Sequence, residues 1–325
     1  MLKKLLLTVL SISLFFSCST GKEKIKVGVS VAMMQESVYA FMKDAMMKEK
    51  KKDGVSILWL SADNTEANQA SNVEDLITQK VNAVILHPVN TAAAAVLVQK
   101  IKDANIPVVA MDRLPLDAPV DAYVTADSYK VGRLQAEFLA QKIGGKGNVI
   151  ILQGEAGNDV AREITRGNLD VLSGYKGIKI VVNLAHKNWA RDAAMATVED
   201  ALTRYKNDIA GILANNSGMA MGAVQAVKAQ KLAGKIVIVG SDADFDACQS
   251  IIDGDLTADV DKKPIELGLE SYRAALKLVK GEALPSADTV KNGKYDVKVI
   301  RTGVELITKD NVASMAYRWP QLKIK

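Results

Sequence analysis

Short runs of β-branched and aliphatic residues alternate with longer stretches of helical periodicity from Ile25 onward. Apolar runs this short are typical of parallel strands that helices cover on both faces. The predicted strands are Ile25–Val31, Val55–Leu60, Ala83–Leu86, Pro107–Met111, Ala122–Thr125, Asn148–Leu152, Lys179–Val182, Gly211–Leu213 and Ile236–Val239. The predicted helices between them are Val38–Lys52, Glu66–Gln79, Thr91–Ala104, Lys130–Ile143, Val160–Ser173, Trp189–Tyr205 and Gly218–Gln230. Strands that alternate with helices in this way predict βαβ units.

The pattern falls into two series, which predict two similar α/β lobes. The first series ends near Thr125–Ser128, where the alternation restarts without a long Pro-, Gly- or Ser-rich linker. After Gly254 the pattern loosens, with predicted strands at Leu256–Val260 and Val297–Arg301 and a predicted helix at Ile265–Lys280. A mature chain of about 300 residues is long enough for two domains of ordinary size.

The first residues, Met1–Ser17, have the pattern of a signal peptide. Lys3 and Lys4 precede an apolar run, and a small residue ends the segment. The apolar run is too short for a membrane-spanning helix, which needs about 20 apolar residues. The sequence therefore predicts export of the chain.

Cys18 follows this segment directly and resembles the lipid-attachment cysteine of bacterial lipoproteins. Phe15 and Phe16 depart from the aliphatic and small residues that are common before such a cysteine. With lipidation, residues 18–24 would form a lipid-anchored tether; the alternative is ordinary secretion. Cys248 is the other cysteine, so an intramolecular disulfide is not expected if Cys18 is acylated.

Composition and charge narrow the possible partners. The formal net charge of +5 over 325 residues is too mild to indicate binding to nucleic acid. Aromatic residues make up 5% of the chain, so a well-placed aromatic side chain is informative.

Polar side chains follow the predicted strands where those strands end. In open parallel α/β sheets, ligands bind beyond the carboxyl ends of the strands. The segments in these positions are Ala32–Tyr39, His87–Asn90, Asp112–Arg113, Gln153–Arg162, His186–Trp189, Asn215–Asn216 and Ser241–Asp242. Their carboxylates, amides, guanidinium groups and indole can together bind the hydroxyl groups and the C–H face of a neutral polyol. Taken singly, each Asp or Asn is also a candidate helix cap.

Several stretches of the mature chain resemble the periplasmic sugar-binding proteins of ABC transporters for ribose, xylose and inositol-like ligands. The most specific are IPVVAMDR (Ile106–Arg113), DSYKVGRLQAEFLA (Asp127–Ala140), GKGNVIILQGEAGNDVARE (Gly145–Glu163), NWARDAA (Asn188–Ala194), ILANNSGMAMGAVQAVKA (Ile212–Ala229) and IVGSDAD (Ile238–Asp244). The resemblance implies an α/β fold of the type I periplasmic binding protein kind. Two Rossmann-like lobes with parallel sheets would be joined by a hinge of three crossing segments. The N-terminal lobe would hold residues 25–126 plus about 260–290, and the C-terminal lobe residues 127–259 plus about 291–325.

The same resemblance implies a function. The protein would capture a monosaccharide or cyclitol between its lobes and deliver it to the permease and ATPase subunits of an ABC importer. It would need no cofactor and would act as a monomer in the cell envelope. The lipid anchor would hold it on the membrane, facing the periplasm or the outside. The alternative use of the same fold is a receptor that presents its closed form to a chemotaxis or sensor protein.

The resemblance also implies ligand-binding residues. Asp112 and Arg113 match an Asp-Arg pair that binds ligand hydroxyls, and Trp189 matches an aromatic residue that stacks on the sugar ring. The remaining matches are Gln35, Tyr39, Asn158, Arg162, Asn216, Asp242 and Lys263.

Some positions depart from the family pattern. Ser217 follows Asn216 where Asp is common, and His87 replaces a more usual Asn. Lys263 is similar to xylose-type members, whereas the stretch around Trp189 is closer to inositol-type members. The sequence therefore leaves pentose, hexose and cyclitol open.

Other functions find less support in the sequence. The chain has two histidines, His87 and His186, and neither fits a Ser-His-Asp catalytic triad. No catalytic residue is therefore predicted. The segment Asp242–Asp246 begins like a calcium loop but lacks the glycine that such a loop requires, so no metal site is predicted. A sugar-responsive repressor would need an N-terminal helix-turn-helix domain, and the leader occupies that place.

Overall fold

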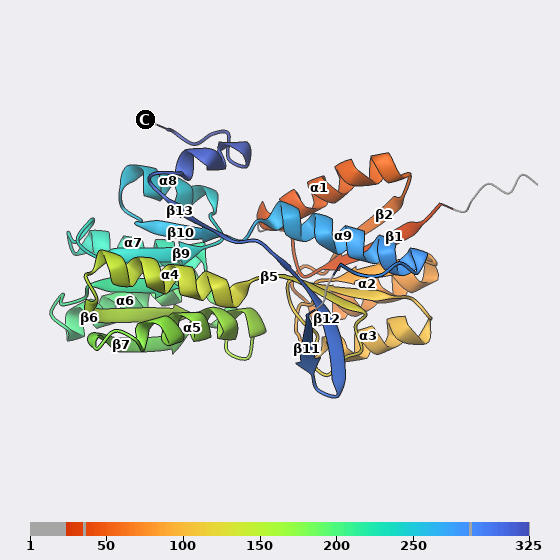
Figure 1. The fold of residues 1–325 in the computed structure, drawn as a ribbon, viewed down its shortest axis with the longest axis horizontal. Helices are drawn as coiled ribbons and strands as arrows, with labels where there is room; N and C mark the ends of the chain where they lie inside the picture. Colours follow the sequence, from red (N-terminus) through yellow and green to blue (C-terminus); the bar gives the residue numbers. More distant parts are fainter. Residues whose placement is uncertain (1–23, 35–36, 286–287, 325) are drawn as a thin grey trace, which may run out of the picture.

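Two β-sheets organise the chain into two lobes that lie side by side (Figure 1). The structure is a computed structural model that describes residues 24–34, 37–285 and 288–324. The predicted signal peptide, Cys18 and Gln35 lie outside the described residues. No helix in those described ranges has the length and apolar character needed to cross a membrane.

The first lobe contains a seven-stranded sheet with the strand order β11-β12-β5-β4-β3-β1-β2. Its strands are β1 (Lys26–Val31), β2 (Ser56–Ser61), β3 (Ala83–Leu86), β4 (Val108–Met111), β5 (Ala122–Ala126), β11 (Thr289–Asn292) and β12 (Tyr295–Thr302). The pairs are parallel except for the antiparallel hairpin β11–β12 at the edge.

Helices cover both faces of this sheet. They are α1 (Ser37–Asp53), α2 (Glu66–Thr78), α3 (Ala94–Asp103) and α9 (Pro264–Lys280). Side chains alternate between the two faces of a strand. In β3, Ile85 accordingly packs in the core beneath α1 and α9, whereas Val84 and Leu86 pack in the core beneath α2 and α3.

The second lobe contains a six-stranded sheet with the strand order β13-β10-β9-β8-β6-β7. Its strands are β6 (Lys146–Gln153), β7 (Gly177–Ala185), β8 (Gly211–Ala214), β9 (Val237–Ser241), β10 (Ala258–Asp261) and β13 (Glu305–Thr308). Its helices are α4 (Ser128–Lys142), α5 (Asp159–Leu172), α6 (Arg191–Arg204), α7 (Ser217–Ala229) and α8 (Phe245–Asp253), with 3₁₀ turns at Lys187–Trp189 (η1) and Val312–Tyr317 (η2). Only β13 runs antiparallel to its neighbour.

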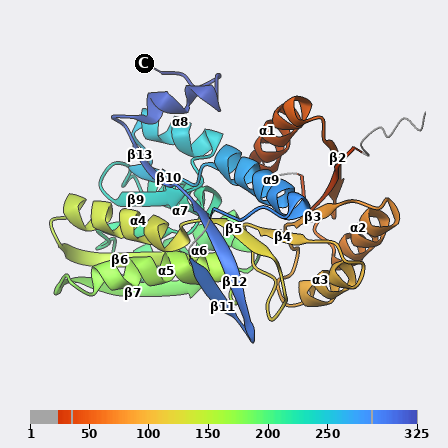
Figure 2. The same cartoon turned by 45° about the vertical axis from the view of Figure 1, so that its right-hand side comes forward.

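The chain crosses between the lobes three times, as Figure 2 shows from a second angle. It crosses after β5, again between β10 and α9, and finally between β12 and β13. The predicted α/β fold with two lobes and a hinge of three crossing segments is thereby confirmed. The sheets are mixed rather than purely parallel, because each has one antiparallel edge strand.

The last crossing lies further along the chain than the sequence predicted. Residues 291–302 were expected in the C-terminal lobe, but β12 pairs with β5 of the first sheet. Val297 and Val299 are buried in the core of that lobe beneath α2 and α3. The alternating pattern of β12 identifies a strand, but its partner depends on tertiary pairing that the pattern does not contain.

Candidate ligand-binding site

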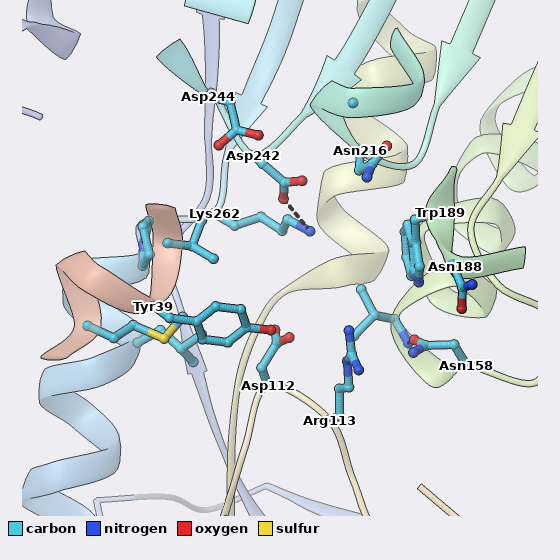
Figure 3. Close-up of a pocket in the computed structure, with 16 residues that line it drawn as sticks. Tyr39, Asp112, Arg113, Asn158, Asn188, Trp189, Asn216, Asp242, Asp244 and Lys262 are labelled. Carbon is cyan, nitrogen blue, oxygen red and sulfur yellow. Dashed lines mark hydrogen bonds and ion pairs between the residues drawn. The ribbon is translucent and has the colours of Figure 1, made fainter. Parts of the chain in front are cut away.

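A cleft of about 350 Å³ lies between the lobes at the carboxyl ends of their strands (Figure 3). It is lined by Val38, Tyr39, Met42, Asp112, Arg113, Asn158, Val160, Asn188, Trp189, Asn216, Gly218, Asp242, Asp244, Lys262, Pro264 and Leu267. Polar and charged groups from both lobes thus face one space, with apolar side chains at its sides.

Asp112 and Asp242 occupy equivalent positions in the two lobes. Asp112 follows β4 and Asp242 follows β9, and both have a positive φ, of 65° and 116°. The backbone N–H of Asp112 donates to the carbonyl of Val124 over 2.7 Å, and that of Asp242 donates to the carbonyl of Val260 over 2.8 Å. The neighbouring strand therefore fixes the turn in each lobe, and both carboxylates face the cleft.

Lys262 brings a positive charge between these two carboxylates. Its Nζ lies 2.6 Å from Oδ1 of Asp242 (Figure 3). Burial disfavours the charged ammonium, but the carboxylates of Asp242 and Asp112 outweigh it and raise the pKa of Lys262. The lysine therefore remains protonated at neutral pH.

The carboxylate of Asp112 lies beside His87 in the first lobe. Nε2 of His87 lies 3.4 Å from Oδ2 of Asp112 and 3.3 Å from the hydroxyl of Tyr39. Burial would raise the pKa of Asp112, but the His87 hydrogen bond and the charges of His87, Lys262 and Arg113 lower it to about 2. Burial lowers the pKa of His87 itself. Asp112 is therefore an ionised acceptor at neutral pH.

Two asparagines serve both as helix caps and as cleft residues. Oδ1 of Asn158 accepts from the N–H groups of Val160 and Ala161 at the start of α5. Oδ1 of Asn216 accepts from the N–H of Met219 at the start of α7. Each cap uses the amide oxygen, so the NH₂ group remains as a donor at the cleft. The capping and the cleft interpretations of these residues are compatible.

Trp189 provides an aromatic wall. Asn188 and Trp189 both have left-handed backbone angles, with φ of 55° and 56°. The indole packs against Gly154, where an added Cβ would lie 2.3 Å from a ring atom. The glycine therefore gives the ring the space to take up its position at the cleft.

The structure brings together most of the predicted site residues. Those that line the cleft are Tyr39, Asp112, Arg113, Asn158, Trp189, Asn216 and Asp242. Gln35 lies outside the described residues. The binding role of each residue remains a prediction.

Arg162 and Lys263 do not line the cleft. The side chain of Arg162 is 61% exposed and lies 3.8 Å from Glu163, on a face of α5 that points into solvent. Lys263 has a φ of 49° at the start of α9 and forms an ion pair with Glu305 at 3.1 Å. Of the two adjacent lysines, Lys262 lines the cleft and the predicted Lys263 does not.

Asn188 and Asp244 also line the cleft, although neither was among the predicted ligand-binding residues. Asn188 lies within the strand-end segment His186–Trp189 named above, so the strand-end rule covers its position. His186 is buried and hydrogen-bonded to the carbonyl of Gln153 and to Thr197, which is a structural role. Across the described residues no group of three or more His, Cys, Asp or Glu side chains could hold a metal ion.

Comparisons with known proteins agree with this fold. The periplasmic binding protein domain family matches residues 27–283. The chain is 29% identical to the D-xylose-binding periplasmic protein of Haemophilus influenzae, covering 96% of this chain and 94% of that protein. It is 32% identical to a putative rhizopine-binding protein of Rhizobium meliloti, with coverages of 91% and 94%.

A solved structure is similar over almost the same length. The ABC transporter solute-binding protein of Bacillus halodurans, with bound myo-inositol, superposes with a TM-score of 0.79 at 27% identity. The similarity covers 92% of this chain and 100% of that one. Fold, family match and relatives agree, and this chain belongs to the periplasmic binding protein domain family.

Proposed function

We propose that this protein captures a monosaccharide or cyclitol between its lobes and delivers it to an ABC importer. The observation that carries the proposal is the convergence of Asp112 and Asp242 from opposite lobes on one cleft, together with Arg113, Asn216 and Trp189. Carboxylates accept hydrogen bonds from hydroxyl groups, and guanidinium and amide groups donate to them. An indole face covers the C–H face of a ring.

The balance of charge supports a neutral ligand. The cleft is lined by two positively charged side chains, Arg113 and Lys262. It is also lined by three carboxylates, those of Asp112, Asp242 and Asp244. An anionic ligand would need a surplus of positive charge, and an amino acid would need separate sites for its two charged ends. Relatives named for xylose and rhizopine, and the neighbour with bound myo-inositol, support the same class of ligand.

The chemistry of the cleft supports binding rather than catalysis. Two of its three carboxylates are already engaged, Asp242 by Lys262 and Asp112 by His87. A ligand that contacts both lobes binds the closed form better and shifts the population toward it. The ABC importer would then recognise the closed, ligand-bound form and accept the ligand from it.

The ligand class is tested by thermal shift of the leaderless protein against D-xylose, D-ribose, D-glucose and myo-inositol, followed by calorimetry. At least one of these polyols is expected to stabilise the protein. Asp112→Ala and Asp242→Ala should each abolish the shift while the protein stays folded. Asp296→Ala, at an exposed position on β12, is the control and should bind normally. Stabilisation by amino acids or nucleosides, and by none of the polyols, would overturn the proposal.

We further propose that Cys18 carries the lipid anchor. The support is the sequence pattern of Met1–Ser17 and the cysteine that follows it. Cys18→Ser is expected to move the full-length protein from the membrane fraction to the soluble fraction. An unchanged distribution between the two fractions would exclude the anchor.

A further inference from the structure

The C-terminal segment packs behind the cleft wall of the second lobe. The 3₁₀ turn η2 lies beside α8 (Figure 1), and Arg318 and Trp319 follow it. Arg318 is 3% exposed and Trp319 is 8% exposed, and neither lines the cleft. Both residues instead contact the loop that carries Asp242.

The hydrogen bonds of this segment converge on two consecutive carbonyl groups. Nη2 of Arg318 donates to the backbone oxygen of Asp242 over 2.8 Å and also to that of Ala243. Nε1 of Trp319 donates to the same oxygen of Ala243 over 2.9 Å. The guanidinium therefore holds the backbone of the loop rather than its carboxylate.

The loop needs such support because its backbone conformation is unfavourable. Asp242 and Ala243 have φ values of 116° and 50°, a region that residues other than glycine rarely adopt. Such conformations persist only when the surroundings hold them from several sides. The N–H of Ala243 donates to Oδ1 of Asp259 over 2.9 Å, and the N–H of Asp242 donates to β10. The C-terminal segment provides the remaining hydrogen bonds, from Arg318 and Trp319 to the backbone carbonyls of Asp242 and Ala243.

Arg318 also anchors the segment that carries Lys262. Its Nη1 donates to Oδ1 of Asp261 over 2.7 Å, and the same oxygen accepts from the backbone N–H of Lys263 over 3.0 Å. Asp261 and Lys263 flank Lys262, whose ammonium pairs with Asp242. One buried cation therefore hydrogen-bonds the backbone of the Asp242 loop and the side chain of Asp261, the residue before Lys262.

The equivalent position of the first lobe is held differently. The carbonyl oxygen of Asp112 lies 2.9 Å from the hydroxyl oxygen of Tyr123 and 3.3 Å from that of Thr125, both on the adjacent strand β5. In the second lobe it is Arg318 that donates to the carbonyl of Asp242, although the two residues are 76 positions apart in the sequence. The geometry of the second wall thus depends on the end of the chain.

We propose that Arg318 is a positioning residue for ligand binding. It fixes the Asp242 carboxylate and the Lys262 ammonium in the cleft without contacting the ligand, and Trp319 adds a second bond to the same loop. The part of this inference that concerns affinity rests on the proposed function, whereas the part that concerns the loop does not.

Arg318→Lys tests the inference, because lysine keeps a cation beside Asp261 but cannot span both carbonyls. Amide hydrogen exchange measured by NMR in the ligand-free protein should accelerate at Asp242 and Ala243 by about tenfold or more, since buried hydrogen bonds are lost there. Exchange at Asp112 should not change. Affinity for D-xylose or myo-inositol, whichever binds the wild-type protein, should fall by about tenfold, as expected for a displaced charged partner.

A matched control separates positioning from loss of stability. Leu202 is buried near the end of α6 that is remote from the cleft. Leu202→Ala should lower the melting temperature while leaving exchange at Asp242 and the affinity as in the wild type. Trp319→Phe serves if Arg318→Lys does not fold. It keeps an aromatic ring next to Phe41, whose ring lies 5.0 Å from that of Trp319, and it removes the indole N–H that donates to Ala243.

Unchanged exchange at Asp242 and Ala243 in the folded variant would overturn the inference. So would an affinity within twofold of the wild type. If the wild-type protein binds none of the polyols and exchange nevertheless accelerates, the positioning role stands and the proposed function fails. The two failures are therefore distinguishable.

Discussion

The carboxylate of Asp112 is surrounded by groups that favour its ionised form. Its pKa in the folded protein is about 2, below its ordinary value of 3.8. As the pH falls, the unfolded chain therefore takes up this proton before the folded protein does. The stabilisation is complete above pH 4 and is lost as the pH falls toward 2. A shift of this size corresponds to about 2 kcal/mol at neutral pH.

Asp112→Asn is expected to lower the free energy of unfolding of the ligand-free protein by about 2 kcal/mol at pH 7. The difference from the wild type should shrink to about half of that at pH 3, because the Asp112 carboxyl of the unfolded wild-type chain is then largely protonated while that of the folded protein is not. Urea denaturation followed by circular dichroism at several pH values measures this difference in the free energy of unfolding. Asp296→Asn should show little effect at any pH. A difference that stays constant from pH 7 to pH 3 would contradict the pKa of Asp112.

At the scale of helices and strands, the repeating units were predictable because their pattern is local. The strand predicted at Ala83–Leu86 has the same bounds as β3. The helix predicted at Ile265–Lys280 differs from α9 only in lacking its first residue, Pro264. The edge strands β11 and β13 were not predicted. Each is short, pairs on one side only and carries few buried residues, so it has no long apolar run.

The site was predictable to the extent that strand ends determine it. Asp112 and Asp242 each follow a strand directly, so their places follow from the strand bounds. Lys262 and Lys263 are adjacent, and the sequence does not show that Lys262 pairs with Asp242 in the cleft while Lys263, in a left-handed conformation, pairs with Glu305. Arg318 could not be assigned a role from the sequence, because its contacts depend on packing between distant segments.

Packing between the loop after β6 and the turn η1 sets the place of Trp189. Gly154→Ala is expected to push the indole away, because the new methyl group would lie 2.3 Å from the ring. Affinity for the polyol should fall by about tenfold, since ring stacking and burial contribute on the order of 1.5 kcal/mol. Calorimetry measures the affinity. Gly174→Ala, which meets only an ordinary contact at 3.4 Å, should bind as the wild type does. Equal affinities of the two variants would contradict this role of Gly154.

At the scale of the whole molecule, the two lobes are joined by side-chain contacts as well as by the three crossings. The hydroxyl of Tyr123, on β5 of the first lobe, donates to Oδ2 of Asp159, at the start of α5 in the second lobe, over 2.8 Å. Burial raises the pKa of Asp159, and the hydrogen bond from Tyr123 acts against that rise. The ring of Phe41, on α1, lies 5.0 Å from that of Trp319 in the other lobe. Both contacts must change when the lobes separate.

Tyr123→Phe removes the hydroxyl of the first of these contacts and keeps the ring. The ligand-free variant is expected to populate more open conformations, because the Asp159 carboxylate regains water only when the lobes separate. Its radius of gyration in X-ray scattering should therefore exceed that of the wild type, and added ligand should reduce the difference. Affinity should fall by about tenfold, as for a hydrogen bond to a charged group worth about 1.5 kcal/mol.

Tyr129→Phe is the matched control for that prediction. Its hydroxyl donates to Asp170 over 2.9 Å, but both residues belong to the second lobe. Loss of this bond should leave both the scattering curve and the affinity unchanged, because it does not connect the lobes. An affinity loss in Tyr123→Phe without any change in scattering would mean that Tyr123 acts on ligand binding through its contact with the carbonyl of Asp112. The contact with Asp159 would then not govern opening of the lobes.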